Sequence, residues 1–451
     1  MQKLYEDQEK VAIEFENWLN NTHIQVAGLW AGAGFGKSHM TKHLIDEVVL
    51  KNSNYEPVLT SMTHSAVAVL AEFAERDAHT LHSVMEWIPK TDKETGETYL
   101  STPRMRDPNS DPRLHAKMLV FVDEAGLVGH DELRLLLEEC KLTGARVVFI
   151  GDNKQCFPVV REGQKLCVPA YDATETMFTL TIPKRVDEGD MIYKLSLAYR
   201  SAVDGGRQPK LTTQLNTDGS GKGVRVVDDL EEYAYAAFEA GKRDGNVKSI
   251  KVLAFTNKRC LNLNRKIRKK VMGLSDPTPI IGEEMVANTA IPTATGDNIL
   301  IRNNQLVFAK EVEKTESYGL AGAFITFETE IDGKLVEVEE TVFVPGSPGK
   351  LNSRLKQLAK EANWLKENGG ANAAREKWRA FHSLKEGCAD IRFTYAMTVN
   401  KAQGTTLKHA LIDLWDINTV RDHEQKVRLA YTAISRASDY VTIEGELDEL
   451  R

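Results

Sequence analysis

The stretch HIQVAGLWAGAGFGKSHMTKHLIDEVVL, residues 23–50, decides the fold of the first part of this chain. It opens with an apolar run typical of a buried strand, and its last part, 38–50, has the spacing of a helix. Between them, AGAGFGKS (31–38) carries the glycines and the Lys-Ser pair of a phosphate-binding loop. Such a loop needs a strand before it and a helix after it. The stretch therefore predicts a nucleotide-binding α/β domain.

The same alternation of buried strands and helices continues along the chain. Runs typical of strands in a parallel sheet are EPVLTSM (56–62), KMLVFVDE (117–124) and RVVFIGD (146–152). A second set comprises SIKVLAFT (249–256), IRFTYAMTV (391–399), HALIDL (409–414) and YVTIEG (440–445). Helical patterns such as HDELRLLLEEC (130–140) lie between the runs. The pattern predicts two α/β halves, each with a parallel sheet.

Two stretches break this alternation and are predicted to be insertions. Residues 87–115 are polar and rich in turn formers, with a hairpin signal at Thr95-Gly96. Residues 286–345 have the pattern of short strands joined by turns, one of them at Asp332-Gly333. A Lys- and Ala-rich segment, 350–382, follows with apolar residues at helical spacing. These residues are Leu351, Leu355, Leu358, Ala362 and Leu365.

Composition narrows the class of protein. With 451 residues the chain is long enough for about three domains. Its 42% hydrophobic and 27% charged residues are typical of a globular protein, and no apolar run approaches the ~18 residues of a membrane span. The acidic, polar N-terminus does not have the pattern of a secretion signal. Five cysteines without CxxC spacing favour a reducing, intracellular setting over a disulfide framework or a zinc site.

Charge argues against a globally basic nucleic-acid binder but leaves room for a local basic groove. The formal net charge is −7, whereas residues 248–271 contain many Lys and Arg and no acidic residue. Distant charges are screened in salt, so such a segment can act locally. A solvated helix face after a buried strand explains it as well as nucleic-acid binding does.

The phosphate loop supplies the first candidate site residues. The backbone N–H groups of Ala33, Gly34 and Gly36 are expected to approach the phosphates of ATP, at the N-terminus of a helix. The side chain of Lys37 is predicted to bridge the β- and γ-phosphates, and the Ser38 hydroxyl to hold Mg²⁺. Ala31 stands where such loops usually have their first glycine, which a small residue with a negative φ tolerates.

Carboxylates at the end of the run 117–124 complete a candidate hydrolysis site. Asp123 is predicted to hold Mg²⁺ through water, and Glu124 to polarise the attacking water. The alternative for the pair is a solvated strand end, which its place after a phosphate loop disfavours. The next strand leads into GDNKQ (151–155), where Gln155 is placed to sense the γ-phosphate. These residues predict an NTPase without saying what the hydrolysis drives.

The order of further motifs resembles that of superfamily 1 helicases, in particular the RecD-like branch (superfamily 1B), over nearly the whole chain. The segments that carry the resemblance are LYEDQEKVAIEF, LTSMTHSAVAVL, HTLHSV, GDNKQ, LTIPKR, AFTNKRCLNLN, MTVNKAQGTTL and YTAISRA. The resemblance implies that Gln8 contacts the adenine base and that Gly404 belongs to the nucleotide site. It also implies that a nucleic-acid strand is held by Thr63, His64, Thr80, His82, Thr398, Asn400 and Lys401.

The chemistry of these residues fits those roles. Hydroxyl, amide and ammonium groups can donate hydrogen bonds to backbone phosphates, which position a strand without reading its bases. An arginine supplied from a second domain stabilises the charge that spreads over the γ-phosphoryl group, and Arg185 and Arg436 are the candidates. The alternative for either arginine is a surface ion pair, and for either histidine a structural role.

The resemblance implies an overall plan and an activity. Two RecA-like P-loop domains are expected at 1–86 with 116–180 (1A) and at 181–285 with 390–451 (2A). A β-hairpin "pin" insertion (1B, 87–115) and an SH3-like barrel with a helical extension (2B, 286–389) are expected within them. The implied activity is ATP- and Mg²⁺-dependent unwinding of DNA with 5′-to-3′ movement along single strands. A cytoplasmic monomer in a bacterial or phage-infected cell, acting at duplex junctions and with replication proteins, is expected.

Three alternatives stay open at this stage. The chain could be a translocase that displaces proteins without useful unwinding, or a helicase directed at RNA. It could also be a P-loop ATPase that acts as a switch or a small-molecule kinase. The segments NKAQGTTL and YTAISRA disfavour the last class because they have no evident task in a kinase.

Overall fold

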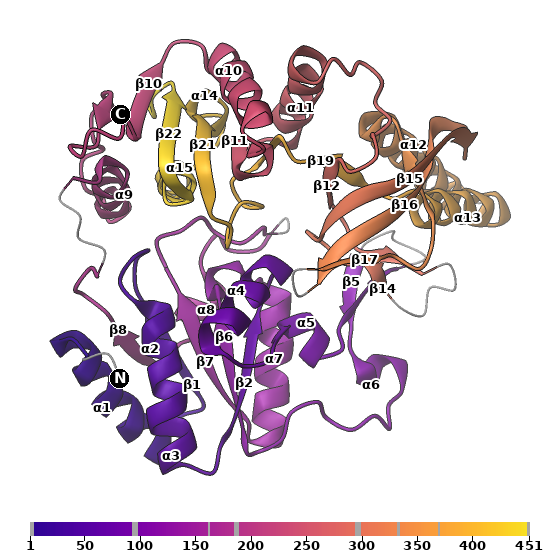
Figure 1. The fold of residues 1–451 in the computed structure, drawn as a ribbon. Coiled ribbons are helices and arrows are strands. Elements are labelled where there is room, and N and C mark those ends of the chain that lie inside the picture. The colour runs from indigo at the N-terminus through magenta and orange to yellow at the C-terminus, as the bar shows by residue number, and fades with distance from the viewer. Residues whose placement is uncertain are drawn as a thin grey trace. The chain divides into compact units, whose positions relative to one another are not determined.

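The computed structural model describes residues 4–92, 98–160, 163–184, 189–293, 299–331, 334–368 and 370–448. The chain forms two compact units, and Figure 1 labels most of their helices and strands. The first unit comprises Met1–Trp87, Thr102–Cys260 and Ala396–Arg451. The second comprises Ile88–Ser101 and Leu261–Tyr395. The predicted turn at Thr95-Gly96, the turn at Asp332-Gly333 and Arg185 lie outside the described residues.

The first unit contains a six-stranded parallel sheet built from the predicted apolar runs. Its order is β3-β2-β6-β7-β1-β8, and every pair in it is parallel. The strands are β1 (Val26–Trp30), β2 (Glu56–Ser61), β3 (Ala78–Thr80), β6 (Met118–Asp123), β7 (Arg146–Gly151) and β8 (Thr176–Thr179). All residues of β1 and β7 are buried, as expected for central strands covered on both faces.

Helices connect these strands, and we call this sheet with its helices the first half. They are α1 (Glu6–Asn20), α2 (Lys37–His43), the π-helix Leu44–Val49, α3 (Leu50–Asn52), α4 (His64–Ala74), α5 (Leu81–Val84), α6 (Pro103–Arg106), the 3₁₀ turn Ala125–Leu127, α7 (His130–Thr143) and α8 (Pro169–Asp172). Buried Arg146 of β7 holds the end of α1, because its guanidinium donates to the carbonyls of Trp18 (2.7 Å) and Leu19 (2.8 Å).

A second sheet in the same unit has the order β20-β11-β21-β22-β10-β9 and is parallel except for β9. Its strands are β9 (Gln214–Leu215), β10 (Gly223–Val227), β11 (Ile250–Ala254), β20 (Ala396–Thr398), β21 (Leu407–Asp413) and β22 (Ala437–Glu444). The helices are α9 (Met191–Ala202), α10 (Leu230–Arg243), the 3₁₀ turn Val247–Ser249, α14 (Leu414–Ile417) and α15 (His423–Ile434), while α11 (Asn257–Val271) begins in this unit and continues into the second. We call this the second half. The prediction of two α/β halves is confirmed.

The second unit is built on an antiparallel sheet of order β17-β16-β15-β12-β19, with β18 paired to β16. Its strands are β12 (Glu284–Ala287), β15 (Leu306–Ser317), β16 (Leu320–Ile331), β17 (Lys334–Glu337), β18 (Val342–Pro345) and β19 (Ile391–Phe393). β15 and β16 are twelve residues each, longer than predicted. The two-residue turn between them, Tyr318-Gly319, has φ values of 56° and 69°, the left-handed pair that a tight hairpin requires.

Smaller elements complete this unit. The pairs β4 (Ile88–Thr91) with β5 (Thr98–Ser101) and β13 (Ile291–Pro292) with β14 (Ile299–Ile301) are antiparallel. The segment 350–382 forms α12 (Pro348–Glu367) and α13 (Ala371–Gly387), as its spacing predicted. Leu351, Leu358 and Ala362 are buried against Trp378 and Phe381 of α13.

One predicted strand is wrong in an informative way. The run IRFTYAMTV was expected to be a single strand, but it is divided between the two units. β19 pairs antiparallel with β12 of the second unit, and β20 pairs parallel with β11 of the first. The residues between them are anchored to the second unit, where Thr394 and Tyr395 donate to the carboxylates of Glu284 (2.6 Å) and Glu283 (2.9 Å). An apolar run in the sequence predicts buried strands. It does not predict which sheet each strand joins.

Among the described residues, no helix is both long and apolar enough to cross a membrane.

Candidate nucleotide and nucleic-acid site

The first sheet brings its candidate site residues to one edge. The strands β1, β2, β3, β6 and β7 are all parallel, so their carboxyl ends lie at the same edge of the sheet. The phosphate loop follows β1, Thr63 follows β2, Thr80 ends β3, and Asp123 ends β6. Ligands of open parallel sheets bind at this edge. The arrangement therefore gathers the predicted nucleotide and strand contacts in one region of the fold.

The phosphate loop has a conformation that only glycine readily adopts at two of its positions. Gly34 and Gly36 have φ values of 81° and 84°, in the left-handed region. Outside glycine, positive φ occurs in the described chain only at Glu75, Glu86, Glu124, Asn304 and Tyr318. Ala31 is therefore in ordinary backbone space, which satisfies the condition for replacing the usual glycine there. Its N–H donates to the carbonyl of Gly151 at 3.0 Å and ties the loop to β7.

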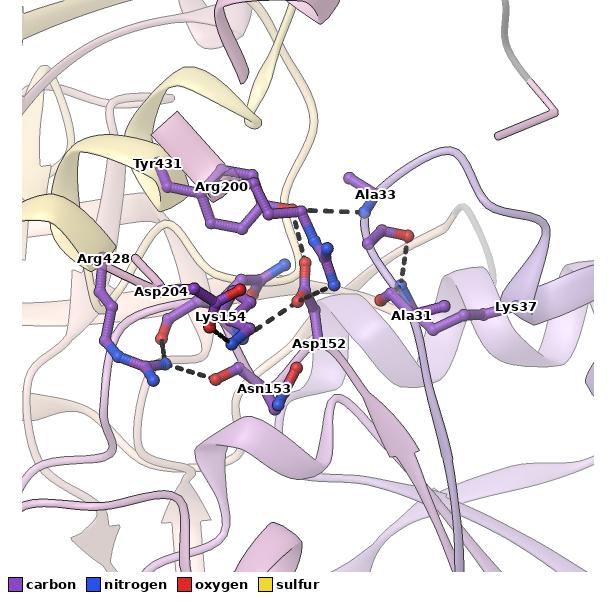
Figure 2. Close-up of polar contacts among 12 residues, drawn as sticks. Ala31, Ala33, Lys37, Asp152, Asn153, Lys154, Arg200, Asp204, Arg428 and Tyr431 are labelled. Carbon is purple, nitrogen blue, oxygen red and sulfur yellow. Dashed lines mark hydrogen bonds and ion pairs between the residues drawn. The ribbon is translucent and has the colours of Figure 1, made fainter. Parts of the chain in front are cut away.

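Lys37 begins α2, and its ammonium group folds over the loop. Its Nζ donates to the carbonyl oxygens of Ala31 at 2.9 Å and Gly32 at 3.1 Å, as Figure 2 shows for Ala31. A cation is thus held over a loop that leads directly into the N-terminus of α2. This combination suits the phosphates of a nucleotide.

The two carboxylates after β6 have different environments. Asp123 accepts the N–H of Glu124 at 2.9 Å, and burial followed by the charge of Glu124 raises its pKa, while Lys37 acts in the opposite sense. Glu124 itself has a φ of 50°, a conformation uncommon for a residue with a side chain. Strained backbone of this kind clusters at functional sites.

These residues fit a divalent cation. Burial penalises the charged form of Asp123, and a second carboxylate next to it adds repulsion that a cation would relieve. Ser38 lies in the first turn of α2, directly after Lys37. Carboxylate and hydroxyl oxygens are the ligands that Mg²⁺ prefers.

Gln8 adjoins the phosphate loop, as expected of a residue that contacts the nucleotide. It lies in the first turn of α1, is buried, and its side-chain oxygen accepts the N–H of Tyr5 at 3.2 Å. A Cβ atom on Gly36 would lie 3.1 Å from its Nε2. Sequence reasoning missed its neighbour Asp7, whose carboxylate accepts from Thr181 N (3.0 Å), Ile182 N (2.9 Å) and Lys184 Nζ (2.7 Å). Asp7 thereby holds the segment that leads from the first half to the second.

Gln155 and its neighbours join the two halves. Its side-chain oxygen accepts from Nε2 of Gln403 at 3.3 Å, and its backbone oxygen accepts from Arg428 of α15 at 3.1 Å. Arg428 also donates to the carbonyl of Asn153 (Figure 2). Nδ2 of Asn400 donates to the carbonyl of Phe157 at 3.0 Å. The loop after β7 therefore contacts the late motif 397–407 and also α15, the helix that contains the start of the motif 431–437.

Arg436 lies directly beyond α15 and is 7% exposed. One Nη donates to the hydroxyl of Ser435 at 3.0 Å, whereas its buried Nε has no partner in the described part of the chain. A buried guanidinium N–H left unpaired is costly, so this position suits an anionic ligand. The catalytic role of Arg436 stays a prediction, as does that of Arg185.

Two of the three threonine hydroxyls predicted to hold a strand, those of Thr63 and Thr80, cap helices. Oγ1 of Thr63 accepts the N–H of Ala66 at 3.3 Å, and Oγ1 of Thr80 accepts that of Ser83 at 3.1 Å. Thr80 also shares a 2.8 Å bond with the Ser83 hydroxyl. Gly404, expected at the nucleotide, lies beside Thr63, since its Cβ would be 3.5 Å from the threonine Oγ1.

The remaining predicted strand contacts are distributed over both halves. The ring of His82 packs edge-on against buried Trp87 at 5.7 Å and its Nε2 lies 3.9 Å from Glu132. His64 begins α4, Thr398 is buried at the end of β20, and Lys401 follows it in a turn. Contacts of these residues with a strand stay predictions.

Two residues of the second half that sequence reasoning missed reach the phosphate loop. The hydroxyl of Tyr431 accepts the N–H of Ala33 at 3.4 Å and donates to Asp152 at 2.5 Å (Figure 2). The Nη2 atom of Arg200 lies 3.5 Å from Asp152, and a Cβ on Gly32 would lie 2.7 Å from its Nε. Tyr431 belongs to YTAISRA, so its motif was available as a signal, but its partners were not.

Comparisons with known proteins agree with this geometry. Residues 4–218 match the model of a family described as "AAA domain". The ATP-dependent DNA helicase dda of Enterobacteria phage T4 is 24% identical over 432 residues, covering 92% of each chain. The chain is therefore similar to this DNA helicase over nearly its whole length.

Two further similarities extend this relationship. An uncharacterized protein of Acanthamoeba polyphaga mimivirus is 20% identical over 497 residues, covering 95% of this chain and 96% of that protein. A structure concerned with DNA unwinding at forked duplexes by two coordinating Pif1 helicases matches with a TM-score of 0.52 and 14% identity. The match covers 98% of this chain and 92% of the Pif1 chain, and at that identity it shows a similar fold.

Proposed function

We propose that this protein is an ATP-driven DNA helicase that moves 5′-to-3′ along single strands and unwinds duplex DNA. The observation that carries the proposal is the convergence of two parallel-sheet halves on one phosphate loop. Lys37 comes from the first half, while Tyr431 and Arg200 come from the second. An enzyme that hydrolyses ATP between two halves can convert the reaction into relative movement.

Each predicted site residue would have its own role in binding or hydrolysing ATP. Gln8 would read the base, the N–H groups of Ala33, Gly34 and Gly36 would hold the phosphates, and Lys37 would neutralise their charge. Ser38 and Asp123 would hold Mg²⁺, which supplies charge stabilisation to the transferring phosphoryl group. Glu124 would orient the attacking water. Arg185 and Arg436 would stabilise the transition state.

The contacts between the two halves would couple ATP hydrolysis to the grip on the nucleic-acid strand. Gln155 meets Gln403, and Gly404 lies next to Thr63. A change at the γ-phosphate that moves Gln155 would therefore reach both sets of predicted strand contacts, Thr63 to His82 and Thr398 to Lys401. A ligand drives motion only through different affinities for two states, so these contacts would hold the strand differently before and after hydrolysis.

The insertions would separate and guide the strands. The β4–β5 hairpin carries Tyr99, which is 40% exposed and is placed to stack on a base. The sheet of the second unit with α12 and α13 would serve as the SH3-like 2B domain, and the domain boundaries given above would apply. Such a monomer would act at duplex junctions in the cytoplasm of a bacterial or phage-infected cell, alongside replication proteins.

Unwinding of tailed duplexes tests activity and direction together. A DNA duplex with a 5′ tail should be unwound when ATP and Mg²⁺ are added, and one with a 3′ tail should not. Single-stranded DNA should raise the ATPase rate manyfold. Stimulation without unwinding of either substrate would favour a protein-displacing translocase, and an equal response to RNA would favour an RNA-directed enzyme.

Replacing Lys37 tests the nucleotide site itself. Lys37→Ala should abolish hydrolysis, because it removes the cation expected at the β- and γ-phosphates. Lys42→Ala is the matched control, since Lys42 lies on the same helix and pairs with Glu75 at the surface. Steady-state ATPase with saturating single-stranded DNA measures both. Near-normal turnover in Lys37→Ala would refute the phosphate-loop assignment.

A further inference from the structure

Tyr431 makes two hydrogen bonds that connect α15 with the first half. The residue is 1% exposed, and its hydroxyl donates to a carboxylate oxygen of Asp152 at 2.5 Å. The same hydroxyl oxygen accepts the backbone N–H of Ala33 at 3.4 Å. Figure 2 shows the phenol placed between the end of β7 and the phosphate loop.

Asp152 fixes the direction of the phenol. Its side chain is fully buried, and besides Tyr431 it accepts the N–H of Lys154 at 3.1 Å and lies 3.5 Å from Arg200. Burial, and then the charge of Asp152, raises the pKa of Tyr431 well above its ordinary value. The phenol therefore stays protonated and donates to Asp152, which leaves only its lone pairs for Ala33.

The N–H of Ala33 is also one of the loop amides expected to hold phosphate. An N–H bonded to the phenol oxygen cannot make a full hydrogen bond to a phosphate oxygen at the same time. The phenol cannot turn its proton toward a phosphate without giving up Asp152. Phosphate binding and the Tyr431 contact therefore compete for the same amide.

We propose that Tyr431 is a positioning residue that reports occupation of the phosphate loop to α15. A phosphate that takes the N–H of Ala33 displaces the phenol and shifts the balance at Asp152 toward Arg200. Because α15 also carries Arg428 and leads to Arg436, the displacement changes how the second half is held against the first. This inference rests on the nucleotide function proposed above and adds to it a specific sensor.

The test is nucleotide affinity in the full-length protein. Tyr431→Phe removes the competing oxygen but keeps the ring. It should bind ADP carrying a fluorescent methylanthraniloyl group about fivefold more tightly, a size typical of one hydrogen bond between neutral groups. It should also lose part of the stimulation of ATPase by oligothymidine. A residue with a merely structural role would lower the affinity when replaced, so a gain distinguishes the two.

Two further variants keep the result interpretable. Asp152→Asn weakens the hydrogen bond that the Tyr431 hydroxyl donates to residue 152, but it keeps an acceptor there. ADP affinity should therefore rise, by less than in Tyr431→Phe. It decides the question if Tyr431→Phe does not fold. Tyr395→Phe is the matched control, because Tyr395 is a buried tyrosine that donates to Glu283 in the second unit. It should leave affinity and stimulation unchanged.

The outcomes separate this inference from the proposed function. Unchanged or weaker ADP binding in folded Tyr431→Phe, with normal wild-type activity, would overturn the sensor and leave the helicase intact. An equal gain in Tyr395→Phe would overturn it as well, since the effect would not be specific to the loop. Wild-type protein that binds no ADP would overturn both.

Discussion

Arg436 carries a buried guanidinium with one N–H that has no partner within the described ranges. A desolvated donor without an acceptor costs free energy, and an anion placed beside it would recover that loss. A buried guanidinium with an unpaired N–H therefore fits a role in binding an anionic ligand better than a role in a surface ion pair. The same reasoning separates it from Arg134, which pairs with Glu138 on the exposed face of α7.

Arg436→Ala should therefore reduce ATP turnover far more than ATP binding. The loss expected for a residue that stabilises transition-state charge is on the order of a thousandfold in kcat. Arg134→Ala, the control, should retain nearly full activity because surface pairs contribute little. Steady-state kinetics with a nucleotide-binding titration measures both quantities. Equal losses in kcat and in affinity would contradict a transition-state role.

At the scale of the element, β21 shows how a polar residue is accommodated in the second sheet. His409 faces its neighbour β22, where its Nε2 lies 2.9 Å from the hydroxyl of Thr442. Burial, and then the charge of Arg225, lowers the pKa of His409 to about 4. The surroundings of His409 in β21 therefore favour the neutral form of its imidazole.

This environment predicts a loss of stability in acid. Because the folded pKa lies below the unfolded value of about 6.5, the unfolded chain binds more protons as the pH falls through that interval. The free energy of unfolding should drop by roughly 2 kcal/mol between pH 7.5 and pH 5 from this group. His409→Gln should lack that part of the drop, whereas His23→Gln, at an exposed position, should keep it. Urea unfolding at the two pH values measures the difference.

The β4–β5 hairpin is the element for which strand separation was proposed. Trp87, the residue before the hairpin, is buried and packs edge-on against His82, whereas Tyr99 in the hairpin is partly exposed. Lys385 of α13 donates to the hydroxyl of Thr98 at 3.2 Å, which braces the hairpin within its own unit.

Deleting residues 90–100 should uncouple unwinding from hydrolysis. Unwinding of a 5′-tailed duplex should fall severely, while single-stranded DNA should still stimulate the ATPase, because the nucleotide site lies on other elements. Tyr99→Ala should reproduce part of the loss, since stacking on a base contributes roughly 1–3 kcal/mol. Full unwinding by the deletion variant would exclude the hairpin as the separating element.

For the molecule as a whole, the two halves of the first unit are held together through α15. The guanidinium of Arg428 is 9% exposed, donates to backbone carbonyls of the loop after β7, and lies 4.3 Å over the ring of Phe157. Cys156 N donates to the Thr432 hydroxyl at 2.8 Å in the same contact. These bonds connect the loop after β7, which is proposed to sense nucleotide, directly with α15 of the second half.

Arg428→Ala should weaken this connection. It leaves the buried carbonyls of Asn153 and Gln155 without a donor, which should lower the free energy of unfolding by about 2–4 kcal/mol. Lys426→Met, on the same helix, keeps the buried stem, removes only a pair with the exposed Asp448 and should change the free energy of unfolding little. Urea unfolding compares the two, and equal effects would show that Arg428 does not hold the halves together.

The sequence by itself determined the parts whose signals are local. The phosphate loop, Asp123 with Glu124, and most strands were predicted, because glycine conformation, strand ends and hydrophobic spacing act over a few residues. Only the tertiary structure decided the rest. It divided IRFTYAMTV between two sheets and placed Gly404 beside Thr63. It also joined Tyr431 to Ala33, 398 positions earlier. Such contacts depend on how whole sheets pack, and no short pattern encodes a partner at that separation.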